Sequence, residues 1–176
     1  MISSANALLL LSTKNPYTLG VFHQILFGDF SYEKNNFHLL KYLQNAGKST
    51  MFIGRERDVK RYDGGTPSIV KPTDMATWIE GAKILPKMDF TWLNYLDFEE
   101  IYQKKQYNTG NPEEIIQKLI RRTDKWILSS YRQLRSKTLM IILGNHGRYR
   151  IDMQYQGKVA EWRAASVPLA IFMLKL

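Results

Sequence analysis

The sequence predicts a three-layer α/β/α fold, in which helices cover both faces of a mostly parallel central sheet. Apolar segments that lack polar alternation, typical of strands buried on both faces, alternate with segments of helical periodicity. The chain has 176 residues and is 44% hydrophobic, which suits a single domain with an ordinary core. It shows no internal repeat or low-complexity tract. We therefore expect residues 1–176 to form one domain.

In the first half of the chain, two helices and one strand are expected. Residues 4–12 are interpreted as a short helix that begins after an N-capping serine. Residues 36–46 are amphipathic, and Gly47 is placed to end that helix. Residues 50–54 (TMFIG) predict a buried strand. Residues 55–72 are polar and rich in turn-forming residues, so we expect a surface excursion there.

The second half alternates more regularly. The expected order is a helix over 74–85, a strand over 88–96, a polar loop over 97–111, a helix over 113–136, and strands over 138–143 and 167–174. The long helix is the strongest of these predictions, because acidic residues open it and basic residues close it, as the helix dipole favours.

Charge and composition limit the function classes. The net charge of +9, from 25 Lys and Arg against 16 Asp and Glu, favours nucleic acid or phosphate-bearing ligands as partners. Basic residues gather within 55–61, 117–125 and 132–137, so one hypothesis is a basic scaffold that binds nucleic acid or an acidic protein. The absence of cysteine excludes disulfides and thiolate metal sites and fits a cytoplasmic protein. No apolar run approaches the roughly 18–20 residues of a membrane span, so no membrane partner is expected.

The histidines are too few and too scattered to predict a metal site by spacing alone. His38 falls among core positions of the helix over 36–46 and is expected to be structural. His146 follows the strand over 138–143, at the kind of strand end where ligand sites of α/β sheets collect. From position alone, Asn145-His146-Gly147 is either such a site or a simple turn.

The order of these segments resembles the alkaline phosphatase superfamily of phosphatases, sulfatases, nucleotide pyrophosphatases and phosphoglycerate mutases. The segments that carry the resemblance are, in order, "SSANALLLLSTKNPYTLGV" (3–21), "LLKYLQNAGKSTMFIG" (39–54), "FTWLNYLDFEEIYQ" (90–103), "KTLMIILGNHG" (137–147) and "AEWRAASVPLAIF" (160–172). They look like the family's nucleophile segment, its next helix and strand, its Asp-x-x-x-His segment, its Asp-His-Gly strand and its closing strand.

The resemblance implies a set of site residues. It assigns Ser3 to the nucleophile position, Glu99, Asn145 and His146 to metal ligands, and Arg148 to the neutralisation of a phosphoryl group. Gln103 and Trp162 stand where the family has histidines. Because so many charged ligands are replaced, the resemblance implies at most one divalent cation (Zn, Mn or Mg) in place of the family's two.

The implied function is therefore either a weak metal-dependent phosphoesterase or a non-catalytic binder of a phosphate-bearing ligand. The family's first strand has no counterpart before Ser3, so the expected fold lacks the first strand and exposes a sheet edge. A partner chain, including a second copy of this one, would cover that edge, unless the native protein begins upstream of Met1.

Overall fold

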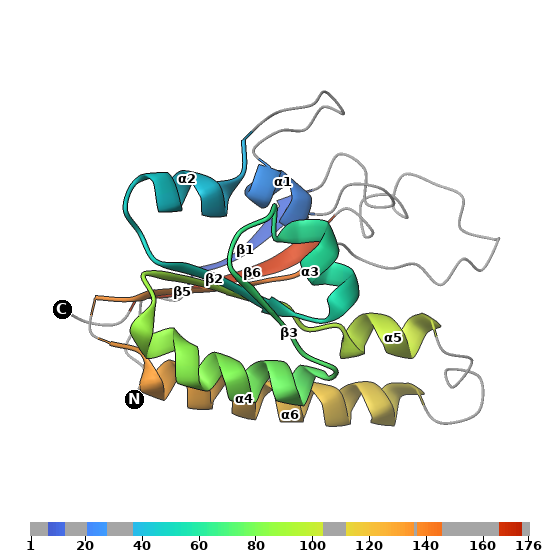
Figure 1. The fold of residues 1–176 in the computed structure, drawn as a ribbon. Coiled ribbons are helices and arrows are strands. Elements are labelled where there is room, and N and C mark those ends of the chain that lie inside the picture. The colour runs from blue at the N-terminus through green and yellow to red at the C-terminus, as the bar shows by residue number, and fades with distance from the viewer. Residues whose placement is uncertain are drawn as a thin grey trace. The chain divides into compact units, whose positions relative to one another are not determined.

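The computed structural model describes residues 7–12, 21–27, 37–103, 112–135, 137–145 and 166–173. The chain divides into two compact units, one made of Met1–Leu39 and Arg135–Leu176 and the other of Leu40–Leu134. Each unit contains a three-stranded sheet and helical structure (Figure 1). The predicted α/β class is confirmed at this level.

The sheet of the unit Leu40–Leu134 is parallel. Its central strand, β2 (Thr50–Gly54), pairs with β3 (Ser68–Val70) on one side and with β4 (Phe90–Leu93) on the other. Phe52 and Ile53 of β2 are fully buried, as the apolar run predicts. The strands predicted over 50–54 and 88–96 are confirmed.

Two crossover connections link these strands. Helix α3 (Glu56–Tyr62) leads from β2 to β3, and α4 (Asp74–Ile84) with the short η1 (Leu85–Lys87) leads from β3 to β4. The two connections run in opposite directions across the sheet, and right-handed crossovers in opposite directions place their helices on opposite faces. Figure 1 shows α3 and α4 on the two sides of the strands.

Helices α4 and α6 (Pro112–Gln133) pack against each other beneath this sheet (Figure 1). The Trp78 and Trp126 rings stack with their centroids 5.4 Å apart. Gly81 lets α4 approach β4 closely, since a Cβ built there would lie 2.8 Å from both terminal methyl carbons of Leu93. The predicted helices over 74–85 and 113–136 are thus confirmed.

Helix α2 (Leu39–Asn45) ends as the sequence predicts. Gly47 has a φ of +76°, its N–H donates to the Gln44 carbonyl at 2.9 Å, and the Lys48 N–H donates to the Leu43 carbonyl at 2.9 Å. This pair of bonds is the Schellman pattern, which requires the left-handed backbone that glycine adopts without strain.

The sheet of the other unit is antiparallel. Strand β6 (Ser166–Met173) lies between β1 (Ala7–Ser12) and β5 (Leu139–Leu143). The unit also contains α1 (Val21–Phe27), of which Leu26 is fully buried. His38 is only 5% exposed and meets the Phe27 ring edge-on with centroids 5.0 Å apart, as expected of a structural histidine.

Three local predictions are wrong. Residues 4–12 were expected as a helix, but Ala7–Ser12 forms β1, paired from Ala7 with Ile171 to Ser12 with Ser166. A leucine run is apolar on every face, so its periodicity cannot distinguish a buried strand from a helix. Pairing with β6 makes this segment a strand. Residues 55–72, which were expected to form a surface excursion, contain α3 and β3. Residues 97–111, which were expected to form a loop, begin with α5 (Asp97–Gln103).

These corrections alter the expected sheet. Among the described residues, parallel pairing is confined to β3-β2-β4, while β1-β6-β5 is antiparallel, so a single mostly parallel sheet is not what the described strands form. The expectation that the family's first strand is missing rested on the lack of a counterpart before Ser3, and residues 1–6 lie outside the described residues. Within the described ranges, no helix is both long enough and apolar enough to cross a membrane.

Candidate functional site

The carboxyl ends of β2, β3 and β4 carry a dense group of charged side chains. Arg55 follows β2, Asp74 opens the helix after β3, and Asn94 and Asp97 follow β4. Because the chain leaves β2 toward β3 and later returns to pair β4 on its other side, the strand order switches direction at β2. Ligand sites of open α/β sheets lie at the carboxyl ends of strands at such switch points.

Arg55 holds three carboxylates together. Its Nε lies 3.2 Å from Asp74 Oδ1, and its two terminal nitrogens donate to Asp97 and Glu100. The Arg55 side chain is 15% exposed, so these ion pairs are partly shielded from water. A planar guanidinium can satisfy three acceptors at once, which an ammonium cannot do in the same geometry.

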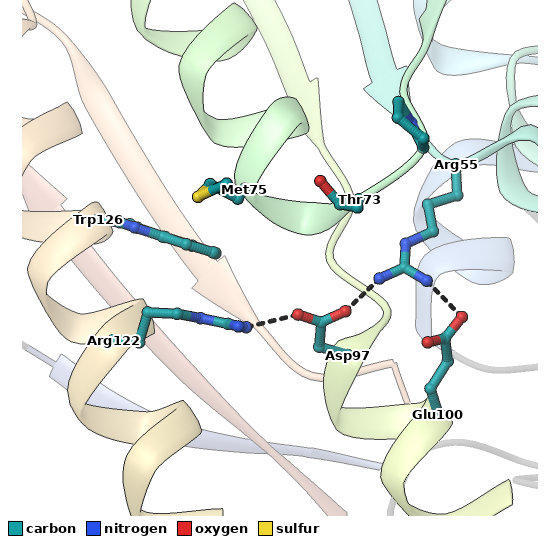
Figure 2. A pocket seen from close by; sticks show the side chains of 8 residues that line it. Arg55, Thr73, Met75, Asp97, Glu100, Arg122 and Trp126 are labelled. Atoms are coloured by element: carbon teal, nitrogen blue, oxygen red, sulfur yellow. Dashed lines mark hydrogen bonds and ion pairs between the residues drawn. The ribbon is translucent and has the colours of Figure 1, made fainter. Parts of the chain in front are cut away.

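Arg122 extends the same network from α6. Its Nη2 lies 2.6 Å from the second oxygen of Asp97, so the Asp97 carboxylate bridges Arg122 and Arg55 (Figure 2). The Arg122 guanidinium carbon also lies 4.4 Å from the centroid of the Trp126 ring. The network therefore ties α6 to the first residue of α5.

Asp74 is a buried anchor for the turn between β4 and α5. It is 1% exposed, and it accepts hydrogen bonds from the Leu96 N–H at 3.0 Å and the Asp97 N–H at 2.7 Å. Burial raises the pKa of the Asp74 carboxyl above its ordinary value, while the two N–H groups and Arg55 act in the other direction.

A second cluster adjoins the first and consists of Arg57, Asp58, Asn94 and Glu99. Arg57 bridges two carboxylates, with Nη2 2.7 Å from Glu99 Oε2 and Nε 3.3 Å from Asp58 Oδ1. The Asn94 side-chain amide donates to the other oxygen of Asp58, and both Asp58 and Asn94 are 3% exposed. Burial raises the pKa of Asp58, and the charge of Glu99 adds to this increase. We call these four residues the Asp58 cluster.

A cavity of about 490 Å³ opens beside the Arg55 network (Figure 2). Its lining combines ion-paired side chains with an apolar wall and consists of Arg55, Pro72, Thr73, Met75, Asp97, Glu100, Arg122 and Trp126. A second cavity of about 460 Å³ shares Arg55, Pro72 and Glu100 with it. The carboxyl ends of the strands thus border two open depressions that are lined by fixed charges.

Of the residues that the sequence assigned to a site, two lie in the described part of the chain. Glu99 is in α5 and is bound by Arg57. Asn145 follows β5, and its Oδ1 accepts a hydrogen bond from the Phe22 N–H at 3.0 Å, in the first turn of α1, where backbone donors lack helical partners. Glu99 and Asn145 belong to different units.

Ser3, His146, Arg148 and Trp162 lie outside the described residues. Gln103, which the resemblance aligns with a histidine of the family, is the last residue of α5. In the ranges that the structure covers, no group of three or more histidine, aspartate or glutamate side chains is arranged to hold a metal ion.

Sequence reasoning missed Arg55, Asp74, Asp97 and Arg122. A signal for two of them was present, because Arg55 directly follows the predicted strand 50–54 and Asp74 opens the predicted helix 74–85. Because residues 55–72 are polar and predict a surface excursion, the sequence analysis predicts neither β3 nor the switch point at β2.

Comparison of the chain with models of known protein families gave no match, and comparison with curated proteins gave none either.

Proposed function

We propose that the protein is a reduced relative of the alkaline phosphatase superfamily that binds a phosphate-bearing ligand with a divalent cation and has, at most, weak phosphoesterase activity. One observation carries this proposal: in a chain of net charge +9, the carboxyl ends of the parallel strands gather more carboxylates than arginines. The carboxylates are Asp58, Asp74, Asp97, Glu99 and Glu100, and the arginines are Arg55, Arg57 and Arg122.

This charge distribution suits a cation and an anion together. A locally acidic edge attracts a hard cation, whose preferred ligands are carboxylate and amide oxygens. The surrounding positive charge raises the local concentration of phosphate esters. Glu99, the ligand that the family resemblance assigns to this region, lies within the acidic edge.

In the proposed chemistry the residues have separate roles. Ser3 would supply the nucleophile, Asn145 and His146 would hold the cation, and Arg148 would neutralise the phosphoryl group. A bound cation would polarise the phosphoryl oxygens. Because most of the family's metal ligands are replaced, we expect the protein to bind the phosphate ester but to hydrolyse it weakly or not at all.

The test combines metal content with hydrolysis. Purified full-length protein is analysed for bound metal and assayed with p-nitrophenyl phosphate with and without added Mn²⁺, beside Ser3→Ala and His146→Ala. Mn²⁺-dependent turnover lost in both variants supports a phosphoesterase. Mn²⁺-dependent binding of the ester without turnover supports a binder. An ester that neither binds nor reacts at any Mn²⁺ concentration would refute the proposal.

A second candidate function is binding of a polyanion such as nucleic acid, and α6 is the observation that favours it. Lys118, Arg121, Lys125 and Arg132 are all exposed and recur at spacings that place them on one side of the helix. Such a stripe can follow a phosphate backbone, and its affinity must fall steeply with salt. Affinity for DNA or RNA that does not change between low and moderate salt would refute this candidate.

A further inference from the structure

Helices α4 and α6 share an outer surface on the side away from the parallel sheet. Both helices belong to the unit Leu40–Leu134, and they lie side by side with the Trp78 and Trp126 rings stacked between them (Figure 1). Their inner sides are buried, since Thr77 of α4 is 0% exposed and Ser130 of α6 is 2% exposed. The opposite sides of the two helices face solvent next to each other.

The outer side of α4 is apolar at two successive turns. Met75 is 55% exposed and Ile79 is 43% exposed. At about 100° per residue, both lie roughly 160° from the buried Thr77 around the helix. Exposed apolar side chains that neighbour each other and are bordered by polar residues are typical of an interaction surface.

The outer side of α6 is basic. Four exposed cations lie roughly 120–180° from the buried Ser130 around the helix, namely Lys118, Arg121, Lys125 and Arg132. Glu114, on the same side, pairs with Lys118 at 2.6 Å and offsets only one of these cations. Asp124 lies about 60° beyond Arg121, on the flank of the helix. The outer side of α6 therefore keeps a positive charge.

We propose that this outer surface, which we call the α4–α6 face, binds an anionic membrane surface. Met75 and Ile79 enter the boundary between headgroups and acyl chains, while the cations of α6 contact the negative headgroups. A cluster of roughly four to eight Lys and Arg on an amphipathic helix is typical of binding to anionic lipids. Such a contact lies on the membrane and needs no helix that crosses it.

The apolar pair on α4 favours a membrane over nucleic acid. A phosphate backbone attracts the basic stripe but offers no apolar partner to Met75 and Ile79. A lipid surface presents negative charge and an apolar layer together, which matches both helices of the α4–α6 face. The inference rests on the same stripe as the polyanion binding proposed above and adds α4 to it. It requires neither a bound cation nor phosphoesterase activity.

The test measures binding of the full-length protein to vesicles by flotation. The protein should float with phosphatidylcholine vesicles that contain about 30% phosphatidylserine but not with pure phosphatidylcholine, because the negative surface attracts the stripe. Arg121→Gln combined with Lys125→Gln should weaken this binding at least about tenfold. The matched control, Lys41→Gln with Lys48→Gln, makes the same change at exposed positions outside the face and should weaken it less than about twofold.

Ile79→Ser tests the apolar pair. It should weaken binding to the anionic vesicles about fivefold, because less apolar surface leaves water on binding. Ile120→Ser is the matched control, since Ile120 is 52% exposed but lies about 160° from Lys118 around α6. Ile120→Ser should leave vesicle binding unchanged. Equal losses in the two serine variants, or equal binding to both kinds of vesicle, would overturn the proposal.

Titration with duplex DNA separates this inference from the nucleic-acid candidate. Ile79→Ser should leave DNA affinity unchanged. Vesicle binding without DNA binding supports the inference and refutes that candidate. DNA binding without vesicle binding overturns the inference and leaves the candidate standing. A protein that binds neither overturns both, whatever the result of the phosphate-ester assay.

Discussion

At the scale of single residues, two arginines separated by one position have different surroundings. Arg55 is 15% exposed and contacts three carboxylates, whereas Arg57 is 49% exposed and contacts two. Removing a partner from a shielded ion pair leaves uncompensated charge, while removing an exposed partner costs little. Burial, not residue type, therefore distinguishes their contributions to stability.

This contrast predicts unequal effects of one substitution. Arg55→Ala should lower the free energy of unfolding by about 3 kcal/mol, because Asp74, Asp97 and Glu100 lose their shared cation. Arg57→Ala should cost less, about 1 kcal/mol, because Glu99 is partly exposed and the buried Asp58 keeps its hydrogen bond from Asn94. Urea unfolding of the two variants beside the wild type measures both values, and equal losses would contradict the description of the network.

Asp74 links the same network to pH. Since burial raises its pKa in the folded state, the native protein holds this proton at pH values where the unfolded chain has released it. The resulting stabilisation is complete below the unfolded pKa of about 3.9 and is lost as the pH rises through the higher folded pKa.

Asp74→Asn removes this titration. At pH 7 the variant should be less stable by about 2 kcal/mol, because an amide cannot accept from both the Leu96 and Asp97 N–H groups as the carboxylate does. The stability gap between the wild type and the variant should widen as the pH is lowered from 7 toward about 4. Denaturant unfolding curves of both proteins across this pH range measure the gap. A stability gap that narrows toward low pH would show that the pKa of Asp74 is not raised in the folded state.

At the scale of elements, the close approach of α4 to β4 depends on a missing side chain. Glycine inside a helix costs about 1 kcal/mol relative to alanine, so Gly81 has a packing reason to be there. The reason is Leu93, whose two methyl carbons lie where a Cβ would meet them. Helix propensity is outweighed here by the contact between helix and sheet.

Gly81→Val should therefore destabilise the protein by about 2 kcal/mol through overpacking against Leu93. Ala82→Val, at the next position of the same helix, provides the control for β-branching and should cost only about 0.5 kcal/mol. Thermal unfolding of both variants compares them. Equal shifts in melting temperature would mean that Leu93 and β4 move aside at little cost and would contradict this packing role of Gly81.

At the scale of the whole molecule, charge is distributed unevenly. The chain carries +9, yet carboxylates outnumber arginines at the strand ends of the parallel sheet, and exposed basic residues line one side of α6. Net charge sets the general attraction to polyanions, but a regular stripe gives each phosphate contact a defined place.

Neutralising that stripe provides the corresponding prediction. Changing Lys118, Arg121, Lys125 and Arg132 to Gln should lower DNA affinity and reduce the slope of log K against log salt by up to about 3.6. A control with the same change in charge replaces the exposed Lys41, Lys48, Lys83 and Lys87 with Gln. Equal losses in both variants, measured by fluorescence anisotropy, would show a general charge effect and contradict a role for α6.

Local patterns in the sequence are enough to locate most helices and strands, but not to pair the strands. Periodicity located α2, α4 and α6, and the apolar runs located β2, β4, β5 and β6, because these signals are local. Whether Ala7–Ser12 is a strand depends on pairing with β6, more than 100 positions away. The antiparallel pairing of β6 with β5 is likewise not a local signal, so both pairings are settled only when the chain folds.

The site follows the same division. The sequence assigned Glu99, which lies within the acidic edge described above, but it could not bring Arg55, Asp58, Asp74 and Asn94 together around the ends of three strands. These four residues come together only when β3 pairs with β2. Strand β3 has three residues, and so short an apolar segment does not predict a strand. Parallel pairing with β2 creates the switch point, and with it the charged cluster that a local pattern cannot contain.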